Sequence, residues 1–150
     1  MDPTNTPERA SLPLFVITPD PLDVDALVAA VNVPAAGAVV TFIGLVRDNQ
    51  DGRAVLALEY EAYPAMAEKE LAALGAAVTA QFGLHAIAIH HRVGKLAVGE
   101  ISVVIAVAGA HRGETFAACA EALEQLKQHV PIWKKEYYAD GATWLGQGGG

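Results

Sequence analysis

A histidine and an arginine stand where an apolar segment gives way to a predicted helix. The run Ala110-His111-Arg112-Gly113 follows the most apolar segment of the chain. Free backbone N–H groups at a helix N-terminus favour an anion, whereas positive side chains there oppose the helix dipole. Binding of a negative group at this position would therefore explain why the positive pair His111 and Arg112 stands at a helix N-terminus. The alternative is an ordinary surface ion pair between Arg112 and Glu114.

Three further cations are candidates for the same kind of site. Lys127 falls in the last turn of a predicted helix, where a lysine can serve only to complement the helix dipole. In the strand that follows, alternation puts Lys134 and Lys135 on opposite faces, so one of them can face a pocket beside Lys127. Arg47 ends a predicted strand at the mouth of a polar loop, a place that an arginine without a function also occupies.

The composition makes these cations informative. The chain has only ten Lys and Arg against 17 Asp and Glu, and its net charge is −7. That balance argues against general nucleic-acid binding, which needs a basic surface. From the residues alone, the chain is an acidic α+β domain with an anion site. The residues of that site are Arg47, His111, Arg112, Lys127 and Lys134.

Other kinds of site lack support in the sequence. Cys119 is the only cysteine, and it sits on the apolar face of a predicted helix, so it is interpreted as a core residue rather than a nucleophile. His90 and His91 are adjacent on a strand and point to opposite faces, which disfavours a shared metal. Nucleotide-binding glycine motifs are absent. We therefore expect no metal and no cofactor.

The elements that must position these residues mix hairpins with crossover helices. One helix is predicted to open at Asp20-Pro21, with Asp20 as its N-cap, and 94–99 is predicted to be a turn. The last helix is predicted to bury one face, made of Phe116, Cys119, Ala120, Leu123 and Leu126. This last helix covers 115–130 and the middle one 64–82. Strands are predicted at 14–18, 37–46, 54–60, 85–93, 100–109 and, as an edge strand, 132–138.

This order indicates an α+β two-layer sandwich, with a mixed or antiparallel sheet and about three helices mainly on one side. A length of 150 residues favours a single domain, which we expect at 14–145. Residues 1–13 are expected to be a disordered leader and 146–150 a flexible tail. No signal peptide is recognisable, and no apolar run reaches the ~20 residues of a membrane span, so a cytoplasmic protein without membrane contact is expected.

Five segments, taken in order, resemble the successive signatures of molybdopterin synthase large (catalytic) subunits. They are Gly37–Asp48 (GAVVTFIGLVRD), Leu58–Leu71 (LEYEAYPAMAEKEL), His90–Glu100 (HHRVGKLAVGE), Ala108–Cys119 (AGAHRGETFAAC) and Leu126–Glu136 (LKQHVPIWKKE). The resemblance implies an α/β hammerhead fold and a sulfurtransferase of molybdenum cofactor biosynthesis.

The resemblance also implies a partner and a substrate. Sulfur would come from a small ubiquitin-like subunit whose C-terminal Gly-Gly carries a thiocarboxylate. The acceptor would be cyclic pyranopterin monophosphate, which becomes the dithiolene of molybdopterin. The large subunit would form a homodimer at the centre of a heterotetramer.

The five cations match functional positions of that family. Lys127 matches its essential lysine and Lys134 the lysine that directly follows its tryptophan, while Arg47 and the pair His111 and Arg112 match its substrate-binding positions. We expect Lys127 to act as acid or base and Lys134 to support it, with all five holding the anionic substrate. Because the sulfur arrives on the small subunit, no cysteine of this chain is needed.

Two alternatives remain open at this point. One is a non-catalytic module, an α+β dimer that senses an anionic metabolite or a protein; the paired lysines around Val130-Pro131-Ile132-Trp133 argue against it. The other is a degenerate relative that docks the small subunit without turnover, against which the presence of all five charged positions argues. The loop Asn49–Ala54 has no clear role in closing over a substrate. The terminal Gly148–Gly150 is interpreted as a tail and not as a sulfur carrier.

Overall fold

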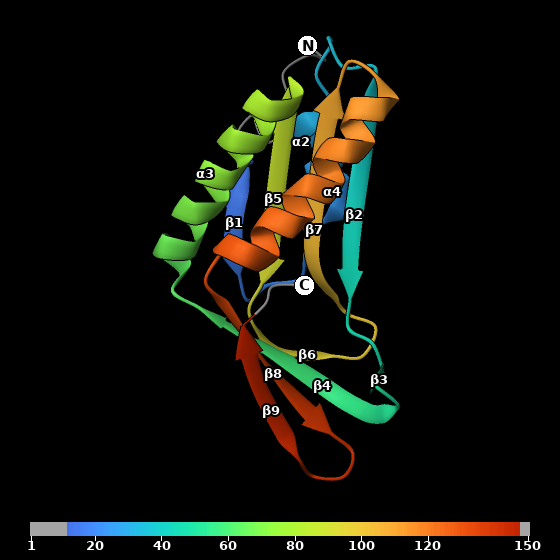
Figure 1. Cartoon of the computed structure of the whole chain (residues 1–150), viewed down its shortest axis with the longest axis vertical. Helices are drawn as coiled ribbons and strands as arrows, with labels where there is room; N and C mark the ends of the chain where they lie inside the picture. Colours follow the sequence, from blue (N-terminus) through green and yellow to red (C-terminus); the bar gives the residue numbers. More distant parts are fainter. Residues whose placement is uncertain (1–11, 148–150) are drawn as a thin grey trace, which may run out of the picture.

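The computed structural model describes residues 12–147, which form two sheets arranged end to end (Figure 1). The helices are α2 (Val24–Val31), α3 (Pro64–Phe82) and α4 (Arg112–His129). The strands are β1 (Phe15–Thr18), β2 (Ala38–Leu45), β3 (Asn49–Gln50), β4 (Arg53–Ala62), β5 (Ala86–Arg92), β6 (Gly94–Ala97), β7 (Ile101–Gly109), β8 (Ile132–Tyr138) and β9 (Thr143–Gln147).

The first sheet carries the core. Its strand order is β1-β5-β7-β2, with β1 parallel to β5 and the other pairs antiparallel. Helices α3 and α4 cover one face and the short α2 covers the other (Figure 1). Both faces of β7 are therefore covered, which explains why Ser102 is the only polar side chain between Ile101 and Gly109.

The second sheet extends the molecule beyond the helices. Its strand order is β3-β4-β8-β9, and β6 pairs with β4 on the side opposite β8. The chain enters it from β2 through β3 and returns to it from α4 through β8 (Figure 1). The fold is thus the predicted α+β arrangement, with a mixed first sheet and an antiparallel second one.

The sequence predicted α3 from residue 64 to residue 82, and this prediction is confirmed. Gly83 ends the helix in the left-handed region at φ 65°, where glycine carries no steric penalty. Gly75, inside the helix, lies against Phe15: a Cβ at that position would stand 2.4 Å from the Phe15 ring. Close packing of α3 on β1 is therefore the reason for this glycine.

Two helix starts were predicted wrongly. The N-cap of α2 is Asp23, whose carboxylate accepts a hydrogen bond from the Ala26 amide at 3.1 Å. Asp20, the predicted cap, lies in a bend where its amide donates to Thr18 Oγ1. Helix α4 begins at Arg112 rather than at Thr115, because the Thr115 hydroxyl donates to the carbonyl of residue 111 at 2.6 Å and belongs to the first turn.

The buried face of α4 is also shifted, by about one residue, from the predicted face. Phe116 is 62% exposed and Ala120 is exposed, whereas Cys119 and Leu126 are buried as expected. The small side chains of Thr115, Ala118 and Ala122 lie against the sheet instead. Small residues let the helix approach β2 and β7 closely. The packing between helix and sheet gained in this way stabilises the fold more than burial of the Phe116 side chain would.

The second sheet contains more strands than the sequence predicted. Residues 94–97, predicted as a turn, form β6, and 132–138, predicted as an edge strand, lies between β4 and β9. Residues 146–147, predicted as part of a flexible tail, belong to β9. The rest of the predicted tail, Gly148–Gly150, and residues 1–11 of the predicted leader lie outside the described residues. Within residues 12–147 no helix has the length and apolar character needed to cross a bilayer.

Candidate functional site

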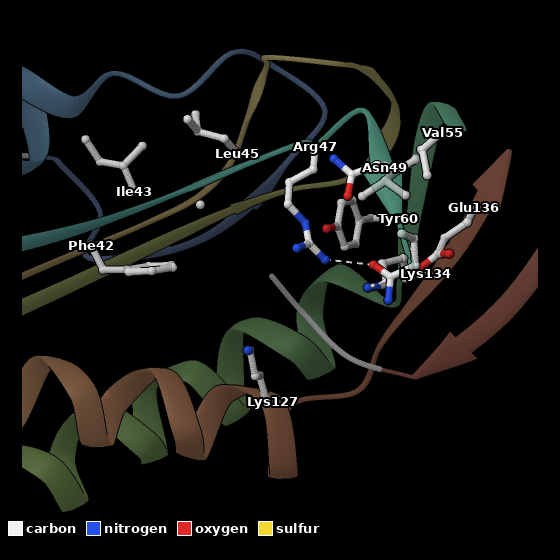
Figure 2. Close-up of a pocket in the computed structure, with 13 residues that line it drawn as sticks. Phe42, Ile43, Leu45, Arg47, Asn49, Val55, Tyr60, Lys127, Lys134 and Glu136 are labelled. Carbon is white, nitrogen blue, oxygen red and sulfur yellow. Dashed lines mark hydrogen bonds and ion pairs between the residues drawn. The ribbon is translucent and has the colours of Figure 1, made fainter. Parts of the chain in front are cut away.

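A cavity of about 510 Å³ opens between the two sheets, beside the C-terminal end of α4 (Figure 2). It is built by β2, by the segment from Arg47 to Gln50 that includes β3, by the paired strands β4 and β8, and by the last turn of α4. The lining residues are Phe42, Ile43, Gly44, Leu45, Arg47, Asn49, Gln50, Val55, Leu58, Tyr60, Lys127, Lys134 and Glu136.

Three of the five predicted cations line this cavity. Lys127 reaches it from the last turn of α4, Lys134 from β8 and Arg47 from the segment that follows β2. The Arg47 guanidinium donates to Gln50 Oε1 at 2.7 Å, which turns it along the cavity wall (Figure 2). Among the described carboxylates, none lies within ion-pair distance of Arg47 or Lys127. Their charges are therefore available to an anion.

Lys134 is held by a buried carboxylate. Its ammonium lies 3.6 Å from Glu136 Oε1, and Glu136 is 4% exposed. The Tyr138 hydroxyl donates to the other carboxylate oxygen, and this hydrogen bond raises the pKa of Tyr138. The sequence analysis did not single out Glu136. Strand alternation was the signal that could have found it, since Lys134 and Glu136 are two residues apart on β8.

Lys135 points to the opposite face of β8, as alternation predicted. Its ammonium lies 5.1 Å from the centre of the Tyr137 ring, and Lys95 lies 4.3 Å from the same ring. The Tyr137 hydroxyl donates to Glu59 at 2.6 Å. Lys135 is thus engaged away from the cavity and serves as a natural control for Lys134.

Tyr60 is a second cavity residue that the sequence analysis did not single out. It pairs with Lys134 in the β4–β8 register and is 2% exposed. Its ring meets the ring of His91 edge-on, with centroids 4.9 Å apart. Burial raises the pKa of Tyr60, so the phenol is neutral. No sequence signal marked it, because an aromatic residue in a strand is ordinarily part of a core.

The other two predicted cations lie at the opposite end of α4. His111 is the N-cap and Arg112 the first helical residue, and both line a separate hollow of about 600 Å³. Lys127 is fifteen positions after Arg112, which corresponds to about 22 Å along a helix. One chain therefore does not bring all five cations together, contrary to the single site that the sequence suggested.

Three observations concern groups that the sequence analysis left outside the site. Cys119 is buried, and burial raises the pKa of its thiol to about 11, so it is not a thiolate. Within residues 12–147 no cluster of three metal-ligating side chains occurs. His91 is fully buried, and burial lowers its pKa to about 4. Its Nδ1 donates to the carbonyl of Arg92 at 2.7 Å.

Comparison with known proteins places these features in context. Residues 17–129 match the family model described as MoaE protein. A molybdopterin synthase catalytic subunit from Halalkalibacterium halodurans is 43% identical over 132 residues, covering 88% of this chain and 85% of the relative. The crystal structure of molybdopterin synthase from Staphylococcus aureus superposes with a TM-score of 0.85 at 37% identity, covering 90% and 98% of the two chains.

A more distant structure shares the fold alone. It is a chain of a protein–protein complex of subunits 1 and 2 of the molybdopterin-converting factor from Helicobacter pylori. The TM-score is 0.67 at 22% identity, and the match covers 83% of this chain and 84% of that one.

Proposed function

Because the chain belongs to the MoaE protein family, the family of molybdopterin synthase catalytic subunits, we propose that the cavity of Figure 2 is the site of sulfur transfer. The acceptor is cyclic pyranopterin monophosphate. The donor is the thiocarboxylated C-terminal Gly-Gly of a small ubiquitin-like subunit. The reaction makes this subunit a sulfurtransferase that forms the dithiolene of molybdopterin.

The observation that carries the proposal is the convergence of Arg47, Lys127 and Lys134 on one cavity in a chain of net charge −7. An arginine and two lysines bind a phosphate by charge-assisted hydrogen bonds. The cavity lining contains neither cysteine nor serine. The sulfur nucleophile therefore comes from a second molecule, and a thiocarboxylate supplies one.

The lysines also suit the proton transfers of the reaction. The thiocarboxylate sulfur forms a bond to a side-chain carbon of the pterin while a C–O bond at that carbon breaks, and the departing oxygen takes up a proton. Water then adds to the carbonyl carbon of the resulting thioester and the C–S bond to that carbon breaks, so the sulfur stays on the pterin; two such transfers give the dithiolene. The small subunit leaves as a carboxylate. Lys127, which has no carboxylate partner among the described residues, acts as acid or base. Lys134, held by Glu136, stabilises the developing negative charge.

A second copy of the chain completes the site with His111 and Arg112. Helix α4 and strand β2 both start at the His111 hollow and both end at the cavity, so they run in the same direction over similar lengths. A two-fold axis across the middle of β2 exchanges these two ends. It therefore carries His111 and Arg112 of the second copy to the cavity of the first.

The surface at β2 suits such a homodimer. Among the described strands β2 pairs only with β7, so its outer edge is free for pairing. Three apolar side chains project from β2 beyond the cover of α2, and Phe116 projects from the adjacent α4. They are Val39 (37% exposed), Ile43 (40%), Leu45 (58%) and Phe116 (62%). Two small subunits on such a dimer give a heterotetramer, and the Helicobacter pylori complex supports a partner of that kind.

Reconstitution tests the proposed reaction. The protein is mixed with a thiocarboxylated small subunit and the pyranopterin precursor, and the dithiolene product is measured. Lys127→Ala is expected to abolish product while leaving binding of the small subunit unchanged. Lys69→Ala, an exposed lysine of α3, is the matched control and keeps wild-type turnover. Absence of product from the wild type, with a partner shown to be thiocarboxylated, contradicts the proposal.

A further inference from the structure

Tyr60 brings a neutral hydrogen-bond donor to a cavity whose other donors are cations and amides. Of the described residues that line the cavity, only Tyr60 carries a hydroxyl. Its side chain lies beside Lys134 across the β4–β8 pair, and Figure 2 shows its oxygen directed toward the hollow. The donor thus faces the cavity that Arg47, Lys127 and Lys134 also line.

The ring is fixed in this orientation. Its edge contact with His91 brings the two ring planes to 75°, and His91 is itself completely buried. The bond from His91 Nδ1 to the Arg92 carbonyl fixes the imidazole in turn. Strand β4 is flanked by β6 and β8, so the backbone that carries Tyr60 is paired on both sides. A donor fixed before binding costs little conformational entropy when the ligand arrives.

The hydroxyl is also available to a ligand. Ser102 is its polar neighbour, and the Ser102 hydroxyl donates to the Gly44 carbonyl at 3.3 Å. A charged oxygen is a stronger acceptor than a serine hydroxyl. An anion in the cavity can therefore accept a hydrogen bond from the Tyr60 hydroxyl, while Ser102 keeps its bond to Gly44.

We propose that Tyr60 donates a hydrogen bond to an anionic oxygen of the ligand beside Lys134, and that His91 is the positioning residue that orients Tyr60. This inference rests on the proposed function for the identity of the ligand. The oxygen belongs either to the phosphate of the pterin or to the C-terminal thiocarboxylate of the small subunit. Both present the same chemistry to a phenol, and the experiment separates them.

Tyr60→Phe tests the donor, because it removes the oxygen and keeps the ring against His91. Tyr137→Phe is the matched control, since it removes a hydroxyl from the opposite face of the same sheet. A hydrogen bond to a charged group is worth about a 10- to 100-fold factor. If the phosphate is the acceptor, Tyr60→Phe raises KM for the pterin by that factor. If the thiocarboxylate is the acceptor, it weakens binding of the small subunit or lowers kcat by that factor.

A double-variant comparison tests His91. His91→Leu removes the ring that orients Tyr60, and its loss of activity is expected to vanish when Tyr60→Phe is already present. Additive losses would assign His91 a general structural role and overturn its part of the proposal. Wild-type values within twofold for KM, kcat and small-subunit affinity in Tyr60→Phe would overturn the donor itself.

A second measurement keeps the test independent of folding and of the proposed reaction. A 3-fluorotyrosine at position 60 replaces one ring hydrogen, and its ¹⁹F resonance reports on the hydroxyl. Inorganic phosphate and the precursor are each added to this protein. A shift of the resonance on addition of either one supports the donor, and no shift with both contradicts it. If the wild type forms no dithiolene but the resonance still shifts, the proposed reaction fails and the Tyr60 anion contact stands.

Discussion

At the scale of single residues, Glu136 decides how Lys134 presents its charge. Glu136→Gln keeps the shape of the side chain but removes the buried negative charge 3.6 Å from the ammonium. Lys134 then loses its anchor, and Tyr138 loses a charged acceptor. We expect turnover to fall by about tenfold or more, because the ammonium loses the charged contact that orients it, and contacts to charged groups are worth about 1.5–3 kcal/mol. Steady-state kinetics measure it.

The control for that prediction is on the outer face. Glu59 accepts a hydrogen bond from Tyr137 on the face away from the cavity, so Glu59→Gln should change stability slightly and turnover by less than twofold. Equal losses of turnover in the two variants would show that Glu136 contributes only to the stability of the sheet.

His91 gives a second residue-scale prediction, on stability against pH. Its pKa is about 4 in the folded protein and about 6.5 in the unfolded chain, so below pH 6.5 the unfolded state binds a proton that the folded state does not. The free energy of unfolding should therefore fall by about 1.4 kcal/mol for each pH unit between about 6.5 and 4. Above pH 6.5 the contribution is constant.

Urea titrations of the wild type and of His91→Gln measure this slope. The variant is less stable at pH 7, but its stability should fall less steeply between pH 6.5 and 4. His129→Gln, at an exposed position, should follow the wild-type slope. A wild-type slope in His91→Gln would mean that other groups set the acid sensitivity.

The sequence predicted a site residue only where its type or position was unusual for this chain. The cations were found because only ten Lys and Arg occur in an acidic chain, so their positions carried information. Glu136 was one acidic residue among 17 Asp and Glu, and only its partner on the same face distinguishes it. Tyr60 could not be distinguished from an ordinary core residue of a strand, because the contact that distinguishes it is with His91, which lies on a strand far away in the sequence.

At the scale of elements, the two helical glycines Gly75 and Gly113 should respond in opposite ways to the same substitution. A Cβ on Gly75 meets the Phe15 ring at 2.4 Å, so Gly75→Ala forces α3 away from β1. We expect it to lower the free energy of unfolding by about 1–3 kcal/mol. A Cβ on Gly113 meets nothing within 4 Å, so Gly113→Ala should raise it by up to about 1 kcal/mol.

Chemical denaturation of the two variants beside the wild type measures both changes. Replacing Phe15 with leucine in Gly75→Ala should recover part of the loss, since it removes the ring that the methyl group meets. A stabilised Gly75→Ala protein would mean that α3 and β1 are not packed as closely as described.

Elements with local signals were predicted, and those that depend on distant partners were not. Helix α3 carries its own stop signal in Gly83, and the β3–β4 turn carries Asp51-Gly52. Strand β6 has four residues and exists because β4 offers it an edge. Likewise, β9 converts the predicted edge strand 132–138 into an inner one. The residues of these short segments do not by themselves predict either pairing.

At the scale of the whole molecule, the sequence identified the charged residues but not their separation. His111 was predicted just before a helix and Lys127 in its last turn, and a helix of that length puts them at opposite ends. What the sequence could not supply was the direction of α4 relative to β2, because this depends on how the sheet is connected. That direction is the reason for proposing that a second copy of the chain contributes to the site.

Mixed dimers test the requirement directly. Lys127→Ala and Arg112→Ala should each be inactive alone, because every site of either homodimer lacks one cation. In a dimer with one chain of each kind, one site carries both substitutions and the other carries none. After unfolding and refolding of an equal mixture, half of the dimers are mixed, so about a quarter of wild-type activity should return. If a single chain supplied both residues to its own site, every site would stay defective and the mixture would remain inactive.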